Sequence, residues 1–298
     1  MKASVIIIDY KRKKYILDAL KSIKNQKGID LNDIEVIVVK YYQDEKIDNY
    51  IKENFLNYKI INLDPNGPDR YCGSALAIGI KEASSNLIFI LDDDDMFTEN
   101  KISRIFEIVK KIKDYDEYLI FHKMIMIYDQ KRKPLKRYRG NNSCLVLYIK
   151  DKDKLIDYIG KIYYVIDQGL LCYFNKNKKI IKVNEPLTYY RIHKENISGS
   201  RRNREVTEMF LRDHQYIYEK TKCKYQIYGI ISYKILLNLI YNANYKISLK
   251  EYLECLLIFD RDYIKRLAKI ILYKLFKNYL KKYYLRKYIF IDLNTQNA

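Results

Sequence analysis

The chain has 298 residues, of which 48% are hydrophobic and 31% are charged. This composition excludes an intrinsically disordered chain, and the length fits one large domain or one domain with a smaller appendage. The formal net charge of +19 favours an anionic partner, such as a phosphorylated substrate, a lipid headgroup or a nucleic acid.

Strand-like and helix-like segments alternate along the first part of the chain. Apolar residues recur at helical spacing from Tyr15 to Ile23, and the strongest turn signal, "DPNGPD", closes the third strand-like run. This alternation predicts a parallel, doubly wound sheet, in which ligands bind beyond the carboxyl ends of the strands. The predicted strands are Ser4–Ile8, Glu35–Val39, Lys59–Leu63 and Asn86–Leu91. The further predicted helices are Lys46–Phe55, Cys72–Ala83 and Thr98–Ile112, the last with Thr98 as its N-cap.

The pattern changes after residue 112. A Lys/Arg-rich connection, Lys131–Gly140, reads as a solvated basic loop, with contact to an anionic acceptor as the alternative. From about Arg201 onward the spacing is helical only, so we expect two domains, residues 1–200 and 201–298. The predicted elements between these points are strands at Tyr118–Tyr128, Ser143–Ile149, Ile180–Val183 and Leu187–Ile192 and a short helix at Asp167–Phe174.

The cysteines indicate neither a disulfide framework nor a zinc ribbon, because their number is odd and no two form a C-x-x-C pair. The five are Cys72, Cys144, Cys172, Cys223 and Cys255. We therefore expect a reducing, cytoplasmic setting. The first apolar run, Ser4–Ile8, is typical of a strand, so we expect no signal peptide. We also expect no spanning helix, since no run reaches the roughly 18 apolar residues that one requires.

Four consecutive carboxylates, Asp92–Asp95, directly follow the apolar run Leu87–Leu91. Like charges at adjacent positions repel, so this cluster is either a solvated acidic loop or a site for something positive. A hard divalent cation such as Mg²⁺ or Mn²⁺ prefers carboxylate oxygens and can bridge them to a nucleotide diphosphate. The cluster stands at the ligand-binding edge of the predicted sheet, and this position favours the cation.

Four ordered segments resemble family 2 glycosyltransferases with the GT-A nucleotide-sugar-binding fold. "SVIIIDYKRKKYILDALKSIKNQ" (Ser4–Gln26) is similar to the opening strand and helix of that family, and "GSALAIGIKEASSNLIFILDDDD" (Gly73–Asp95) to the stretch that leads into its D-x-D motif. "VIDQGLLCYF" (Val165–Phe174) is similar to the segment that supplies the catalytic base, and "EPLTYYRIHKENIS" (Glu185–Ser198) to a closing element with Arg-x-His. The resemblance covers roughly residues 3 to 198.

The resemblance implies an α/β, GT-A-like fold, with a mostly parallel central sheet flanked by helices and a helical C-terminal region. It also implies a metal-dependent, inverting glycosyltransferase with Mn²⁺ or Mg²⁺ as cofactor. Such an enzyme moves one sugar from a nucleotide-sugar donor to a hydroxyl of a glycan, a lipid-linked sugar or a protein glycan. The chain contains no Trp, so the Gln-x-x-Arg-Trp signature of processive synthases is absent and a single addition is favoured.

The resemblance further implies roles for individual residues. Asp94 and Asp92 fall on the D-x-D carboxylates, where Asp94 binds the metal and Asp92 binds the metal or the donor ribose. His193 falls on a histidine near the metal and the diphosphate, and Asp167 on the aspartate that deprotonates the acceptor hydroxyl. The alternatives for these two are an ordinary histidine and a helix-capping aspartate.

On the nucleotide side, the resemblance places Asp9 and Tyr10 where the first strand reaches the donor, beside Asp92 and Asp93. The chain departs from the family in "VVKYYQDE", where Lys40 replaces a base-reading aspartate. The other departures are Leu76 and Ala77 in place of an Arg-Asn pair and Ile166 in place of a glutamate. These differences leave the donor open, and a catalytically inactive GT-A-fold binding protein is an alternative.

A basic, amphipathic segment lies near the end of the sequence. Residues 261–288 contain ten Lys or Arg and one acid, and apolar residues recur at helical spacing from Ile264 to Leu275. This pattern predicts peripheral contact with the anionic inner face of a membrane, with a helix packed on its own domain as the alternative. A basic nucleic-acid-binding protein is disfavoured, because no helix-turn-helix, RNP-like or zinc pattern is present. A nucleotidyltransferase is disfavoured because "DYKRKKY" contains no glycine.

Overall fold

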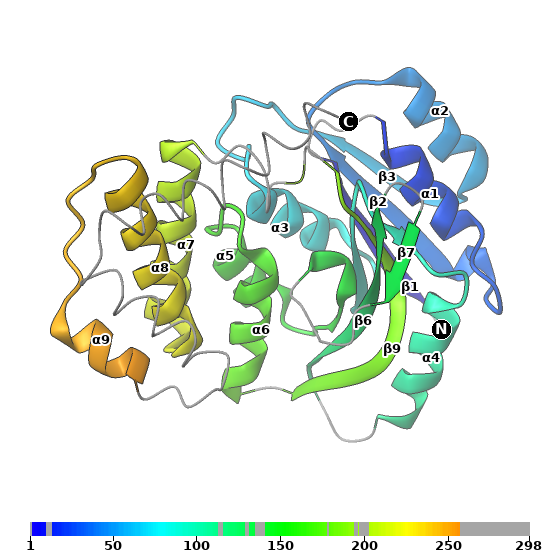
Figure 1. Ribbon diagram of the computed structural model, residues 1–298. Helices are drawn as coiled ribbons and strands as arrows, with labels where there is room; N and C mark the ends of the chain where they lie inside the picture. Colours follow the sequence, from blue (N-terminus) through cyan, green and yellow to red (C-terminus); the bar gives the residue numbers. More distant parts are fainter. Residues whose placement is uncertain are drawn as a thin grey trace. The chain divides into compact units, whose positions relative to one another are not determined.

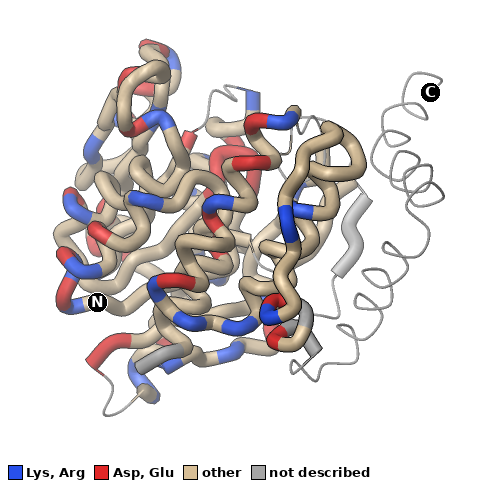
Figure 2. Tube along the Cα trace, turned by 90° about the vertical axis from the view of Figure 1, so that its left-hand side faces the viewer, with Lys and Arg blue, Asp and Glu red and all other residues tan. Residues whose placement is uncertain are grey.

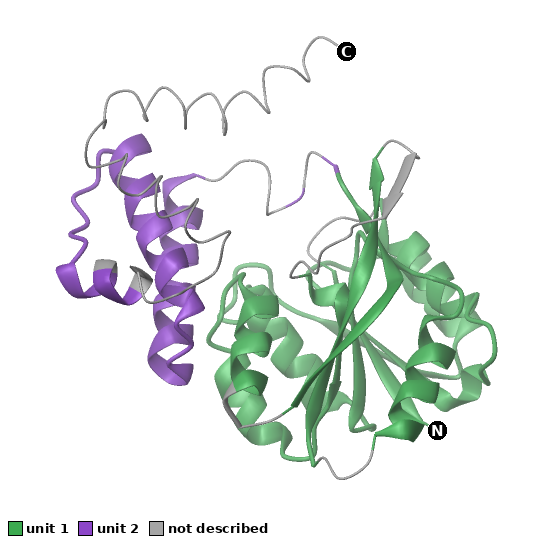
Figure 3. Cartoon of the chain, turned by 60° about the horizontal axis from the view of Figure 1, so that its bottom comes forward, with its two compact units in different colours: residues 1–192 green, residues 193–298 purple. Residues whose placement is uncertain are grey.

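The computed structural model of the protein describes residues 2–9, 14–112, 116–128, 131–134, 141–177, 179–193, 196 and 203–256. The chain divides into two compact units, Met1–Ile192 and His193–Ala298 (Figure 3). The predicted domains, 1–200 and 201–298, stay a prediction, because compactness by itself does not test independent folding.

Several sequence predictions fall outside the described residues. They concern the nucleotide position Tyr10, residues 135–140 of the basic connection and the basic segment 261–288. These three also stay predictions.

The described residues of the first unit form a nine-stranded sheet in the order β3-β2-β1-β4-β8-β6-β9-β5, with β7 paired to β6 (Figure 1). The strands β1 to β4 run parallel, and β6 and β9 run in the same direction because β8 is antiparallel to both β4 and β6. The short strands β5 and β7 run the other way. The predicted mostly parallel sheet is therefore confirmed. The strands are β1 (Ala3–Asp9), β2 (Ile34–Lys40), β3 (Asn57–Asn62), β4 (Leu87–Asp92), β5 (Met96–Phe97), β6 (Tyr118–Tyr128), β7 (Lys131–Pro134), β8 (Leu145–Tyr148) and β9 (Lys179–Arg191).

Helices cover both faces of the central strands (Figure 1), and β1 is accordingly buried along its whole length. On one face, side chains of α1, α2 and α4 pack with Val5 and Ile7 in a single apolar cluster. On the other face, α3 approaches so closely that a Cβ at Gly79 would lie 2.5 Å from Ile6 Cγ2. There α5 contacts α3, and α6 contacts α5, β6 and β9. The helices are α1 (Ile16–Lys24), α2 (Glu45–Asn54), α3 (Cys72–Glu82), α4 (Lys101–Lys111), α5 (Lys152–Ile159) and α6 (Ile166–Asn177).

The fourth helix begins later than predicted. It starts at Lys101 with Asn100 as N-cap, so the prediction that Thr98 caps it is wrong. The Thr98 hydroxyl instead donates to the Leu187 carbonyl at 3.2 Å, and the Thr98 N–H donates to the same carbonyl at 3.1 Å. The local sequence assigned this hydroxyl to a helix cap, but it binds β9 at a residue that lies 89 positions later in the chain.

One long strand, β9, replaces the two short strands predicted at Ile180–Val183 and Leu187–Ile192. The polar interruption at Glu185 and Pro186 lies where the pairing of β6 with β9 shifts register. Proline is tolerated at such an irregularity because no N–H is needed there. Glu185 forms an ion pair with Arg104 of α4 at 2.7 Å, so its charge is compensated without ending the strand.

The described part of the second unit is mainly helical. Helices α7 (Arg204–Thr221) and α8 (Tyr225–Ile240) pack on each other, and Lys222, with a φ of 56°, ends α7. A non-helical stretch, residues 241–248, separates them from α9 (Leu249–Leu256), so the expectation of helix throughout is wrong for this stretch. Within the described ranges, no helix combines the length and the apolar character that crossing a bilayer requires.

Candidate functional site

Buried charges gather at one edge of the sheet. Charged residues of both signs are spread along the described chain (Figure 2), but seven of the described Asp, Glu, Lys and Arg residues are buried. Six of the seven lie at the carboxyl ends of β1, β2 and β4 or at the start of α4. Because parallel strands share one carboxyl edge, these charges are brought together where such sheets bind ligands. The six are Asp9, Lys40, Asp93, Asp94, Asp95 and Lys101.

The four aspartates after β4 form a buried acidic turn, Asp92–Asp95. The Asp95 N–H donates to the Asp92 carbonyl at 3.1 Å, which closes the turn. Carboxylate oxygens of Asp92, Asp94 and Asp95 lie within 4.8 Å of one another. Asp93 and Asp95 have no exposed surface and Asp94 is 4% exposed, so the interpretation as a solvated acidic loop is wrong.

A second segment, Asn141–Cys144, forms side-chain hydrogen bonds with the acidic turn. We call this segment the brace. Ser143 Oγ donates to Asp95 Oδ2 at 2.7 Å and accepts from the Asp92 N–H at 2.9 Å. Asn141 Nδ2 donates to Asp95 Oδ2 at 3.1 Å, and Asn142 Nδ2 donates to Asp92 Oδ1 at 3.1 Å. The brace thus donates hydrogen bonds from two side-chain amides and one hydroxyl to the carboxylates of Asp92 and Asp95.

The sequence analysis missed the brace. It predicted one strand from Ser143 to Ile149, whereas Asn142–Cys144 is a short 3₁₀ helix and the strand β8 begins at Leu145. The pairing of β8 with β4 is antiparallel, and this pairing carries the residues before β8 to the end of β4. No local signal marks the segment, because its partners lie about fifty positions earlier.

Asp95 is the most constrained carboxylate of the acidic turn. Burial raises its pKa well above the ordinary range, and the charges of Asp94 and Asp92 raise it further. The hydrogen bonds from Ser143 and from the Arg191 N–H, which is 3.0 Å from Asp95 Oδ1, act in the opposite direction. The turn therefore gathers carboxylates in a buried position, where a bound cation would relieve the repulsion among them.

Arg191, the last residue of β9, binds the acidic turn through backbone groups. Its Nε donates to the Asp94 carbonyl at 3.1 Å, and its Nη2 pairs with Asp18 of α1 at 2.7 Å. The guanidinium also lies 4.7 Å from the ring centroid of Tyr15. Arg191 therefore contacts the acidic turn and forms an ion pair with α1 at the same time.

Asp167, the predicted catalytic base, lies in the first turn of α6 and is partly exposed. Burial raises its pKa, and the N–H groups of Gln168 and of Asp167 itself lower it. These N–H contacts are those of a helix-start residue, so the capping alternative stays open. Burial raises the pKa of the Cys144 thiol, the charge of Lys101 lowers it, and the charges of Asp95, Asp92 and Asp167 raise it.

The ends of β1 and β2 hold two internal pairs. Tyr42 donates its hydroxyl to Asp9 Oδ2, while Lys40 Nζ pairs with Asp48 Oδ1 at 3.0 Å and donates to the Tyr42 carbonyl at 2.9 Å. Burial is the largest cause of the raised pKa of Tyr42, followed by the hydrogen bond to Asp9 and by the charges of Asp9, Asp93 and Asp44. The predicted nucleotide residues Asp9 and Asp93 are therefore neighbours at the ends of β1 and β4.

Three other positions from the sequence analysis are less central. His193 lies two residues after the end of β9, and its N–H donates to Asn196 Oδ1 at 2.6 Å. It is not part of the carboxylate group, so its metal role stays a prediction. Leu76 and Ala77 are buried on α3, with 0% and 6% exposure. At these two positions the chain offers packing side chains instead of polar groups.

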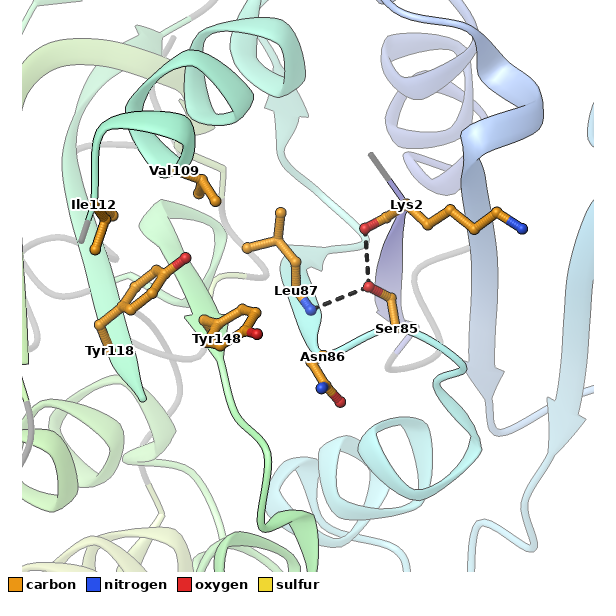
Figure 4. A pocket seen from close by; sticks show the side chains of 8 residues that line it. All are labelled: Lys2, Ser85, Asn86, Leu87, Val109, Ile112, Tyr118 and Tyr148. Atoms are coloured by element: carbon orange, nitrogen blue, oxygen red, sulfur yellow. Dashed lines mark hydrogen bonds between the residues drawn. The ribbon is translucent and has the colours of Figure 1, made fainter. Parts of the chain in front are cut away.

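A cavity of about 320 Å³ lies at the opposite edge of the sheet, where β1 and β4 begin (Figure 4). Tyr118 and Tyr148 stack there with ring centroids 5.0 Å apart, and Ser85 Oγ donates to the Lys2 carbonyl at 2.9 Å. No residue of the acidic turn lines this cavity, so we distinguish it from the candidate site. Its lining residues are Lys2, Ser85, Asn86, Leu87, Val109, Ile112, Tyr118 and Tyr148.

Comparison with known proteins gives a matching family model and two related sequences. A family model described as Glycosyl transferase family 2 matches residues 4–166, more than half of the chain. The uncharacterized glycosyltransferase YwdF of Bacillus subtilis (strain 168) is 31% identical over 105 residues, which are 35% of this chain and 37% of that protein. An uncharacterized glycosyltransferase of Rickettsia bellii (strain RML369-C) is 29% identical over 137 residues, which are 45% of this chain and 18% of that protein. The matches thus span well under two thirds of either relative.

The fold has a solved counterpart. A crystal structure of S. aureus TarS residues 1–349 in complex with UDP-GlcNAc matches with a TM-score of 0.57 at 17% sequence identity, over 91% of this chain and 81% of that one. A likeness at this level of identity concerns the fold alone. It confirms the predicted GT-A-like α/β fold, with a mostly parallel sheet flanked by helices and a helical C-terminal region.

Proposed function

The chain belongs to glycosyl transferase family 2, and from this membership we propose that it transfers one sugar from a nucleotide-sugar donor to an acceptor hydroxyl, with a divalent cation as cofactor. The observation that carries the proposal is the acidic turn at the carboxyl end of β4, with three carboxylates whose oxygens lie within 4.8 Å of one another. Asp167 of α6 supports it, because it lies in the segment Val165–Phe174 that resembles the base-supplying segment of the family.

The donor atoms of the acidic turn suit a hard cation, since they are carboxylate oxygens only. We propose Asp94 and Asp92 as the main ligands for Mn²⁺ or Mg²⁺ and His193 as an additional one. Asp95 already accepts three hydrogen bonds, from Ser143, Asn141 and the Arg191 N–H, so we assign it to shaping the turn. A bound divalent cation would stabilise the negative charge that develops on the departing diphosphate.

Asp167 is the proposed catalytic base. In the transfer, the acceptor oxygen forms a bond to the anomeric carbon while the bond from that carbon to the diphosphate oxygen breaks. The acceptor proton goes to the Asp167 carboxylate, and attack from the face opposite the leaving group inverts the anomeric centre. The raised pKa of Asp167 supports this role, because a base accepts a proton better when its pKa lies closer to the working pH.

Donor recognition is proposed for the ends of β1 and β4, with Asp9, Tyr10, Asp92 and Asp93 facing the nucleotide. The solved TarS structure holds UDP-GlcNAc, which makes UDP-sugars the first donors to test. The acceptor that we propose is a hydroxyl of a glycan, a lipid-linked sugar or a protein glycan. The departures at Lys40, Leu76 and Ala77 concern this side of the site, so the nucleotide is the least specified part of the proposal.

The decisive experiment is the substitution Asp94→Asn. Calorimetry with Mn²⁺ and UDP, GDP or dTDP should show metal-dependent nucleotide binding in the wild type and a loss of at least about 100-fold in the variant, since one carboxylate ligand is removed. The fold should be retained, because the change relieves repulsion among the buried carboxylates. Asp116→Asn, at a side chain that is 94% exposed, is the matched control.

Wild-type nucleotide affinity in Asp94→Asn would contradict the metal assignment. Salt-sensitive binding of arbitrary DNA, without any effect of nucleotides, would favour the basic nucleic-acid-binding alternative.

We also propose a cytoplasmic protein that contacts the inner face of a membrane through the basic segment 261–288, which lies outside the described residues. The support is the charge pattern alone, ten Lys or Arg against one acid. Flotation with anionic liposomes tests the contact. The full chain should float at low salt and a chain ending at residue 260 should not, and a full chain that fails to float would remove the membrane from the proposal.

A further inference from the structure

Ser143 is the centre of the brace and has no exposed surface. Its hydroxyl makes two hydrogen bonds of opposite direction to the acidic turn, donating to Asp95 Oδ2 at 2.7 Å and accepting from the Asp92 N–H at 2.9 Å. One oxygen atom therefore fixes the carboxylate at one end of the turn and the backbone at the other end. The distance between these two residues in space depends on where the Ser143 hydroxyl lies.

The Ser143 backbone is itself held by two other side chains. Its carbonyl accepts from Lys101 Nζ at 2.6 Å and from Thr188 Oγ1 at 2.8 Å, and Lys101 Nζ also lies 3.1 Å from Thr188 Oγ1. Lys101 is fully buried and its Nζ lies 3.6 Å from the ring centroid of Phe97. An amine donates hydrogen bonds whether it is protonated or neutral, so this anchoring does not depend on the charge of Lys101.

The hydrogen bonds from Lys101 and Arg191 go to groups other than the proposed ligand oxygens. A lysine or arginine that paired directly with Asp92 or Asp94 would compete with a divalent cation for the same oxygens. Lys101 instead donates to a carbonyl and a hydroxyl, and Arg191 donates to the Asp94 carbonyl and to Asp95 through its backbone N–H. Both basic residues thus order the turn through groups that are not the proposed ligands.

We propose that Ser143 is a positioning residue for the divalent cation, which sets Asp92 and Asp95 at their mutual distance, and that Lys101 and Thr188 anchor it. This inference rests on the proposed function, because it concerns the same acidic turn. It predicts that the turn is shaped before the cation arrives, so the loss of one neutral hydroxyl should weaken cation binding although no ligand is removed. Outer partners of metal ligands typically contribute 10- to 100-fold to metal affinity.

The test is Mn²⁺ binding, followed by the EPR signal of the free aquo ion, in the wild type and in Ser143→Ala. The matched control is Ser22→Ala. Ser22 Oγ also donates once, to the Ala19 carbonyl at 2.7 Å, and accepts once from a backbone N–H, that of Phe97 at 3.0 Å, but it contacts no carboxylate. We expect about 10-fold weaker Mn²⁺ binding in Ser143→Ala and unchanged binding in Ser22→Ala. Both variants should melt at lower temperature, so melting alone does not distinguish them.

A second variant covers the case in which Ser143→Ala does not fold. Asn141→Ala removes the other side-chain donor to Asp95 Oδ2 from a residue that is only half-buried, and it should weaken Mn²⁺ binding by a smaller factor. Unchanged Mn²⁺ affinity in a folded Ser143→Ala protein would overturn the inference while the wild type and Asp94→Asn still differ. If the wild type itself binds no Mn²⁺, the proposed function fails first, and the two failures are distinguishable.

Discussion

The ends of β2 and β4 lie at the same edge of the sheet, but they handle buried charge in opposite ways. At the end of β2, the fully buried Lys40 is neutralised inside the chain by Asp48, at 3.0 Å. At the end of β4, carboxylate oxygens of Asp92, Asp94 and Asp95 lie within 4.8 Å of one another, while Lys101 donates to the Ser143 carbonyl and Arg191 Nε to the Asp94 carbonyl. One strand end carries an internal ion pair, and the other gathers carboxylates of one sign.

This difference suggests that the charges of Lys40 and Asp48 stabilise the fold, whereas the carboxylates of Asp92, Asp94 and Asp95 serve binding. A buried ion pair is satisfied within the fold and needs no ligand. Carboxylates that are held close together repel one another, and the pKa of Asp95 is raised well above its usual range, so a proton or a cation that binds there lowers the repulsion. The comparison therefore predicts that changes at the end of β4 alter cation binding and transfer, whereas changes at the end of β2 alter stability and leave cation binding unchanged.

The largest effect is expected for Asp167→Asn, which sharpens the functional side of the comparison. The substitution keeps the shape of the side chain and removes its ability to accept a proton. We expect sugar transfer to fall by about 100- to 10,000-fold while Mn²⁺ and nucleotide binding are retained. Transfer is measured with the donor that the binding experiment identifies. A rate near that of the wild type would remove Asp167 from the mechanism and favour the capping interpretation.

The second prediction concerns the ion pair between Lys40 and Asp48 at the end of β2. Asp48→Asn leaves the buried Lys40 without its carboxylate, so the free energy of unfolding should fall by about 3 kcal/mol. Lys40→Met removes the buried charge and leaves Asp48, whose side chain is 21% exposed, in contact with water, so it should change stability by less than about 1 kcal/mol. Urea unfolding gives both values. Loss of Mn²⁺ binding in either folded variant would break the comparison.

The last prediction is a pH dependence at Lys101, whose amine donates to the carbonyl of Ser143 in the brace. Burial lowers the pKa of Lys101 to about 7 from 10.5, although the charges of Cys144 and Asp95 oppose the shift. Between these two pH values the unfolded chain holds a proton that the folded chain lacks, so stability should rise with pH across this window. Below pH 7 both states are protonated and the cost of the buried charge is fully present.

Lys101→Met should remove this rise, which amounts to at most about 1.4 kcal/mol per pH unit. The measurement is urea unfolding from pH 6.5 to 9.5, with Lys24→Met as control, because Lys24 is an exposed lysine of α1 outside the brace whose amine donates to the Asn54 carbonyl at 3.1 Å. Equal slopes in Lys101→Met and the wild type would show that the amine at position 101 remains protonated throughout.

The local pattern of the first half predicted its elements and their order. The apolar runs that became β1, β2 and β4 and the helical spacing of α1 to α3 lie within a few residues of the observed bounds, because each depends on neighbours in sequence. Where prediction failed, a distant contact replaced a local one. The Thr98 hydroxyl donates a hydrogen bond to β9 and does not cap α4. The strand β9 continues through Pro186 because it pairs with β6 on both sides of that residue.

The sequence by itself determined the four carboxylates of the acidic turn, their place after a buried strand and the edge of the sheet on which they stand. Only the tertiary structure decided which groups hold them. The hydroxyl of Ser143 reaches Asp95 across 48 positions, and the N–H of Arg191 reaches it across 96. Carboxylates after a strand follow from the order of residues, but their hydrogen-bond donors depend on the antiparallel pairing of β8 with β4 and of β9 with β5, which no local spacing encodes.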